Sequence, residues 1–102
     1  MVHVLALIQA KAGKRAQILQ AFKANMPAVL AEQGCIEYQP VIDSAAAPGF
    51  AGQIGPDTFA VIEKWESMDA LAAHAAAPHM ASYAATVKDW IDSRVVHVLE
   101  NA

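Results

Sequence analysis

The chain has 102 residues, of which 56% are hydrophobic, and carries a formal net charge of −3. This length suits one domain spanning residues 1–102, and the acidic balance gives nucleic acid or an anionic membrane surface no electrostatic reason to bind. No run approaches the roughly 18 apolar residues of a membrane span, and the N-terminus lacks a secretory signal pattern. With Cys35 as a lone thiol, these features predict a cytoplasmic protein with no membrane or nucleic-acid partner.

The first predicted element is a strand over residues 2–10, because its side chains alternate between two faces. One face carries Val2, Val4, Ala6 and Ile8, and the other carries His3, Leu5, Leu7 and Gln9. Both faces are largely apolar. In an antiparallel sheet we therefore expect helices to cover one face and a second subunit to cover the other.

A turn at residues 11–14 precedes a predicted amphipathic helix. Apolar residues recur at helical spacing at Ile18, Leu19, Phe22, Met26, Val29 and Leu30. Pro27 lies inside this pattern and removes a backbone donor, so we expect a kink or a divided helix there. Gly34 suits the stop at the C-terminal end of the helix.

Residues 35–43 predict a second strand, with Ile36, Tyr38 and Ile42 on one face. Pro40 cannot donate to a ladder of hydrogen bonds, which indicates an edge strand or a bulge. Residues 44–57 have no periodicity and contain glycine and proline, so they predict a loop. A loop of this length is typical of a lid or a partner contact, with Phe50 and Ile54 as its apolar anchors.

The third strand is predicted over residues 59–65, and Ser67 follows as the N-cap of a short helix. Pro78 is placed to begin a second long helix, and a fourth strand covers residues 94–100. The order strand, helix, strand, strand, helix, strand predicts an α+β, ferredoxin-like split β-α-β fold with an antiparallel four-stranded sheet. Pairing of two bare sheet faces then predicts a homodimer, a dimeric α+β barrel.

Glu63 and Trp65 are two residues apart and therefore share a face of the third strand. Trp65 is interpreted either as core packing or as the wall of an internal pocket. Glu63 needs a partner if it is buried. It is interpreted either as one half of a salt bridge, for example to Arg94, or as a group that orients a histidine or takes a proton from a substrate.

His74 and His79 would diverge by about 140° on an unbroken helix, but Pro78 breaks it and allows them to converge. Two histidines without a clear third ligand are a weak signal for a metal, and we predict no metal site. His79 and Tyr83 are four residues apart and share a helix face. A histidine facing an apolar pocket can take a proton from a phenol, although a structural role is equally open for each histidine alone.

Taken together, these residues resemble the antibiotic biosynthesis monooxygenase family, including its quinol monooxygenase branch. The resemblance spans nearly the whole chain, and its ordered pieces are the opening strand with Lys-Ala-Gly-Lys, EQGCIEY at residues 32–38, EKWES at residues 63–67, His74, and Pro78-His79-Met80. It implies a homodimeric barrel whose subunits oxidise a quinol or another phenolic or polycyclic aromatic compound with molecular oxygen and no cofactor.

The resemblance also implies site residues. We expect catalytic roles for Trp65, His74 and His79, and substrate contacts from Glu63, Tyr83, Tyr38 and Phe59. Some members place an asparagine on the third strand where this chain has Val61, so an asparagine-assisted oxygen step is not expected. Haem-degrading relatives use an asparagine on the first strand, which this chain lacks. Haem binding is therefore the second hypothesis, and a non-catalytic, dimeric small-ligand module is the third.

Overall fold

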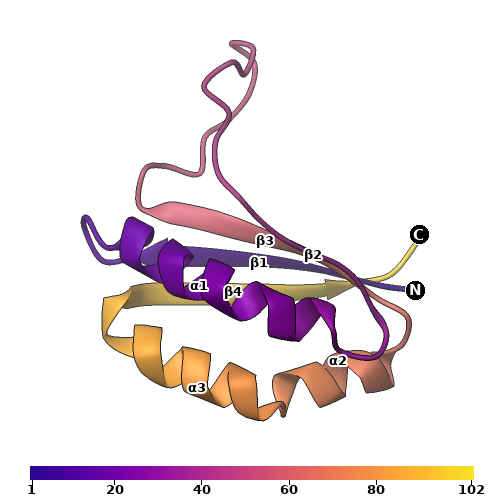
Figure 1. Cartoon of the computed structure of the whole chain (residues 1–102). Coiled ribbons are helices and arrows are strands. Elements are labelled where there is room, and N and C mark those ends of the chain that lie inside the picture. Colours follow the sequence, from indigo (N-terminus) through magenta and orange to yellow (C-terminus); the bar gives the residue numbers. More distant parts are fainter.

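The computed structural model describes all 102 residues. The chain forms one antiparallel sheet whose helices lie on a single face (Figure 1). The elements are β1 (Val2–Ala10), α1 (Arg15–Leu30), β2 (Cys35–Val41), β3 (Thr58–Trp65), α2 (Met68–Ala75), α3 (Pro78–Val87), the 3-10 turn η1 (Lys88–Trp90) and β4 (Ile91–Leu99). The four strands lie in the order β2-β3-β1-β4. The predicted ferredoxin-like α+β fold is confirmed.

β1 lies in the middle of the sheet, and its burial alternates as the sequence predicts. The side chains beneath the helices are buried, at Val2, Val4, Ala6, Ile8 and Ala10. Ile18, Phe22 and Val29 of α1 pack against them, together with Val87 of α3. Removal of this apolar area from water is the main force that holds α1 and α3 on the sheet.

The opposite sheet face carries apolar side chains that remain accessible. Leu5, Ile62, Val95 and Leu99 are 36%, 38%, 50% and 48% exposed. The register places Leu5 opposite Ile62 on one side and beside β4 on the other, so these residues form a continuous surface. Among the helices, none combines the length and hydropathy needed to span a bilayer.

Two expectations about the first helix are wrong: Pro27 does not divide it, and Gly34 does not cap it. α1 runs without interruption from Arg15 to Leu30 and includes Pro27. Proline removes only one backbone hydrogen bond, and the buried Phe22 and Val29 on either side of it keep the helix on the sheet. The cap of this helix is Ala31, not Gly34.

Gly34 instead lies in the turn that leads into β2, with φ of +83°. A Cβ atom there would lie 2.6 Å from the Cβ of Ala70 in α2. Both the backbone conformation and the close approach of α2 therefore require glycine at this position.

A bulge in β2 changes which side chains share a face. Cys35 pairs with Trp65 and Glu37 pairs with Lys64, which leaves Ile36 as an extra residue between them. Tyr38 is buried, whereas Ile36 is 47% exposed and Ile42 lies beyond the end of the strand. The predicted shared face of Ile36, Tyr38 and Ile42 is thus wrong, while the edge position indicated by Pro40 is confirmed.

The loop of residues 42–57 projects away from the sheet between β2 and β3 (Figure 1). Phe50 is 91% exposed and therefore does not anchor this loop, contrary to expectation. The base of the loop is held by Asp43, whose carboxylate accepts from the backbone N–H groups of Ile54 at 3.0 Å and Gly55 at 2.9 Å. These two bonds favour the ionised form and lower the pKa of Asp43.

The segment after β3 folds as its capping residues predict. Ser67 has an extended backbone, and its Oγ accepts from the backbone N–H of Ala70 at 3.1 Å, which starts α2. Pro78 occupies the first turn of α3. The short break between the two helices brings His74 and His79 to the same side of the sheet.

Candidate active site

A cavity of about 580 Å³ lies between the helix-covered face of the sheet and α2 and α3. Nineteen residues line it, and fifteen of them are hydrophobic. The polar or charged exceptions are Glu63, His74, Lys88 and Arg94. A cavity of this size with few polar groups suits an apolar ring system that a small number of contacts orient.

An aromatic cluster forms one wall of the cavity. Phe22 stacks on Tyr38 with ring centroids 5.0 Å apart and meets Tyr83 edge-on at 5.8 Å. Burial raises the pKa of Tyr83 to about 12 and also raises that of Tyr38, so both remain neutral phenols at physiological pH. Tyr38 and Tyr83 line the cavity, whereas Phe59 is fully buried behind Phe22 and is not part of its lining.

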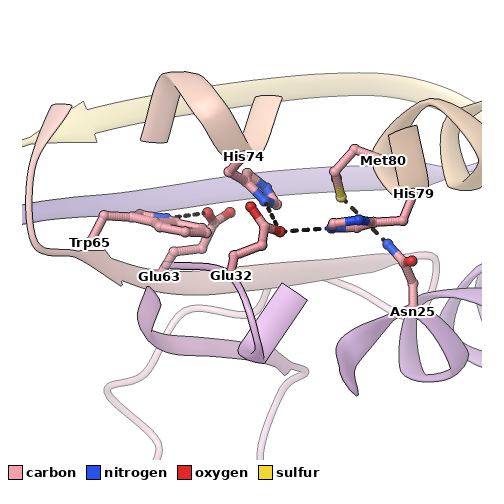
Figure 2. A network of polar contacts seen from close by, with 7 residues as sticks. All are labelled: Asn25, Glu32, Glu63, Trp65, His74, His79 and Met80. Atoms are coloured by element: carbon pink, nitrogen blue, oxygen red, sulfur yellow. Dashed lines mark hydrogen bonds and ion pairs between the residues drawn. The ribbon is translucent and has the colours of Figure 1, made fainter. Parts of the chain in front are cut away.

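Glu63 and Trp65 share a face of β3, as predicted, and are bonded to each other. The indole Nε1 of Trp65 donates to Oε1 of Glu63 at 2.9 Å (Figure 2). Glu63 forms no salt bridge with Arg94. Its burial raises the pKa of the carboxyl, against the lowering effects of the indole donor and of His74.

Trp65 is completely buried and does not line the cavity. Its ring lies 4.6 Å from that of His74, centroid to centroid, at a tilt of 36°. Trp65 therefore supports two polar groups of the cavity wall from behind: it packs against His74 and donates to Glu63.

Glu32, just after α1, joins both histidines of the site (Figure 2). Its Oε2 accepts from Nδ1 of His74 at 2.9 Å and from Nε2 of His79 at 2.8 Å. A carboxylate can only accept, so each of these ring nitrogens carries a proton. One oxygen thus fixes the tautomer and orientation of two imidazoles from two different helices.

The other ring nitrogen of His74, Nε2, makes no hydrogen bond within the chain. Every fully buried side-chain nitrogen or oxygen has a partner, so Nε2 is not fully buried, and the side chain that carries it lines the cavity. When the ring is neutral, the proton on Nδ1 leaves a lone pair on Nε2. His74 therefore presents a proton acceptor to an apolar cavity.

His79 has a different position from the one its spacing suggests. It makes no hydrogen bond with Tyr83 and does not line the cavity; its bond is to Glu32. Met80, the next residue, does line the cavity and its sulfur accepts from Nδ2 of Asn25 at 3.4 Å. The break at Pro78 thus turns His79 toward α1 and Met80 toward the cavity.

Sequence reasoning did not select Glu32 or Phe22 as site residues. Glu32 is 42 residues from His74 and 47 from His79, so no local spacing links them. The sequence did offer one signal for Glu32: it begins the EQGCIEY segment, one of the pieces on which the family resemblance rests. Phe22 follows the apolar helical pattern of α1, which does not separate a cavity wall from ordinary core.

The topology and the site define a ferredoxin-like α+β protein with an apolar cavity beneath its helices. Residues 1–86 match the antibiotic biosynthesis monooxygenase family, and the chain belongs to this family. It is 36% identical over 102 residues to the probable quinol monooxygenase YgiN of Escherichia coli K12, covering 98% of this chain and 97% of that protein. The YgiN protein of Shigella flexneri is equally similar.

Solved structures show the same fold at lower sequence identity. An antibiotic biosynthesis monooxygenase homologue from Nitrosomonas europaea matches with a TM-score of 0.81 and 20% identity, covering 99% of this chain and 98% of that one. A conserved protein from Methanosarcina mazei matches with a TM-score of 0.83 and 19% identity, covering 99% and 92%. At these identities the likeness is one of fold.

Proposed function

We propose that the protein is a cofactor-independent monooxygenase that oxidises a quinol or a related phenolic compound with molecular oxygen. The observation that carries the proposal is the free Nε2 of His74, which faces an apolar cavity while Glu32 holds Nδ1. The membership of the chain in a monooxygenase family and its similarity to a probable quinol monooxygenase support the reaction class.

In the proposed reaction, Nε2 of His74 takes the hydroxyl proton of the bound phenol. The resulting phenolate gives an electron to O₂, and the two radicals combine at a ring carbon that carries hydrogen. The peroxide anion formed there takes the proton back from Nε2 of His74 and becomes a hydroperoxide. Loss of water from this hydroperoxide leaves a quinone, so one oxygen atom stays on the ring and the other leaves as water. The apolar surroundings of each tyrosine make its protonated, uncharged form the stable one.

The remaining site residues have supporting roles in this proposal. Tyr38, Tyr83 and Glu63 contact the substrate, since all three line the cavity. Trp65 packs behind His74 and donates to Glu63, and His79 holds Glu32 in place. Trp65 and His79, which were expected to be catalytic, are positioning residues in this proposal, because neither lines the cavity and each acts through its neighbours.

A purely structural role is less well supported. Side chains do not fill the cavity, whose volume is about 580 Å³. Glu63 is bonded to an indole rather than fixed in a salt bridge, so its second oxygen is left for a ligand. Both features are those of a site that receives a small molecule.

The bare sheet face supports assembly into a homodimer as part of this proposal. Leu5, Ile62, Val95 and Leu99 together expose apolar area that a second copy would cover. Val95→Asp would place a charge in this contact. Sedimentation at low micromolar concentration is expected to give a dimer for the wild type and a monomer for the variant, and a wild-type monomer would contradict the assembly.

Oxygen consumption with a panel of hydroquinones and naphthohydroquinones tests the function. The wild type should raise uptake above autoxidation, and His74→Ala should lower the rate by about 100-fold, the usual contribution of a general base. Lys23→Ala, at an exposed position of α1, is the matched control and should keep the full rate. Uptake at the autoxidation level with every compound, or an unchanged rate in the histidine variant, would refute the proposal.

A further inference from the structure

The cavity has two cations in its wall that the proposed reaction does not use. Lys88 of η1 and Arg94 of β4 line it, in a chain with only seven lysines and arginines. Neither side chain takes part in a salt bridge within the chain. Both are exposed, so the cavity opens to solvent where they lie. Two positive charges without a salt-bridge partner, at the opening of a mostly apolar cavity, suit a ligand with a negative group.

The strand register places Arg94 on the cavity side of the sheet. Arg94 pairs with Ile8 of β1, whose side chain is buried beneath the helices. The positive charge of Arg94 also acts on the phenol of Tyr83, where it opposes the effect of burial on the tyrosine pKa. Arg94, Lys88 and Tyr83 therefore mark one end of the cavity.

Glu63 and His74 mark the other end. Glu63 pairs with Val4 and Arg94 pairs with Ile8, a separation of four residues along β1, or roughly 13 Å. The two residues are also two strands apart across the sheet, which adds roughly 10 Å in the perpendicular direction. Their backbones are then about 16 Å apart. Both residues line the cavity, so the space between their side chains is shorter than this backbone separation and suits a ligand of about two fused aromatic rings.

We propose that Arg94 and Lys88 form an anion subsite, and that the substrate is a bicyclic hydroxyarene with a carboxylate on the ring remote from the reacting hydroxyl. The planar guanidinium of Arg94 matches the two oxygens of a carboxylate, and Lys88 adds a second charge. This inference rests on the proposed function for the hydroxyl that meets His74. The subsite itself is a matter of binding and does not require turnover.

A matched pair of ligands tests the subsite. Titration calorimetry compares 6-hydroxy-2-naphthoate with its carboxamide, which has the same shape and no charge. The wild type is expected to bind the carboxylate about tenfold more tightly, a preference that falls as salt is added. Equal affinities for the two ligands at low salt would overturn the inference.

Variants assign the preference to the two cations. The double variant Arg94→Gln with Lys88→Gln should bind both ligands with the affinity that the wild type has for the carboxamide. Arg94→Lys should retain most of the preference, and Lys23→Gln on α1 should retain all of it. A double variant that still prefers the carboxylate would refute the assignment. The titrations are made under nitrogen, where O₂ is absent and binding is measured without turnover, so the absence of oxygen uptake with any quinol would refute the proposed function and leave the subsite standing.

Discussion

Replacement of Glu32 by alanine tests whether one carboxylate holds both imidazoles of the site. The change removes the acceptor of two hydrogen bonds, of 2.9 Å to His74 and 2.8 Å to His79. The side chain of His74 is only 7% exposed, so its orphaned N–H finds little water. That of His79 is 29% exposed and can be hydrated. The broken bond to His74 should therefore cost more stability than the broken bond to His79.

The expected loss of stability is about 2 kcal/mol, since leaving a buried donor unpaired costs about 1–3 kcal/mol and the His79 bond adds little. For a domain of this size it corresponds to a fall in Tm of about 10 °C. Glu32→Gln keeps an oxygen that can accept both bonds but removes the charge, and charge-assisted hydrogen bonds are about twice as strong as neutral ones, so its loss should be about half as large. Thermal unfolding followed by circular dichroism measures both.

Glu66→Ala is the matched control, because Glu66 is exposed and has no salt bridge within the chain. Its stability should stay within about 0.5 kcal/mol of the wild type. Oxygen uptake should fall in Glu32→Ala, because the ring of His74 loses the bond that orients it, and should be unaffected in Glu66→Ala. If the two alanine variants had the same Tm and the same rate of oxygen uptake, the carboxylate of Glu32 would not position the histidines.

Two further predictions concern β3 and the turn before β2. The pKa of Glu63 is raised by burial, so its contribution to stability is complete below the unfolded-state pKa and is lost as pH rises through the folded-state value. Glu63→Gln, which can still accept from Trp65, should therefore be more stable than the wild type at neutral pH but not in acid. The free energy of unfolding is measured in denaturant at several pH values, and a difference between variant and wild type that stays constant with pH would contradict this. Gly34→Ala should cost about 2–4 kcal/mol, from a positive φ and a clash with Ala70. Gly13→Ala has a positive φ but open space, so it should cost about 1–2 kcal/mol in the same melting experiment, and equal losses would rule out the clash.

The sequence was sufficient for features that depend on local chemistry. The alternation in residues 2–10 predicted the two faces of β1, Ser67 and Pro78 marked the starts of their helices, and Pro40 indicated the edge strand. Each of these depends on backbone preferences or on burial over a few residues. The order of these elements was then enough to identify the fold.

Features that depend on tertiary packing could not be predicted from the sequence. The bulge at Ile36 is set by the pairing of β2 with β3, and Pro27 stays within the helix because Phe22 and Val29 on either side of it are buried against the sheet. Glu32 meets its histidines only after α1, α2 and α3 have packed on the sheet. Phe50 was expected to be buried because it is apolar, but its loop leaves the body of the protein.

The bonds at the base of that loop have a consequence for how the sequence can vary. Asp43 holds the backbone of Ile54 and Gly55, and Arg15 donates to the carbonyl oxygen of Gly55 at 3.3 Å, so the two ends of the loop are joined before its tip begins. The cost in chain entropy of a longer tip grows only slowly with length once its ends are held. Residues 45–53 are therefore a permissive segment, where an inserted peptide or a fluorescent label can be placed at a distance from the cavity and the sheet.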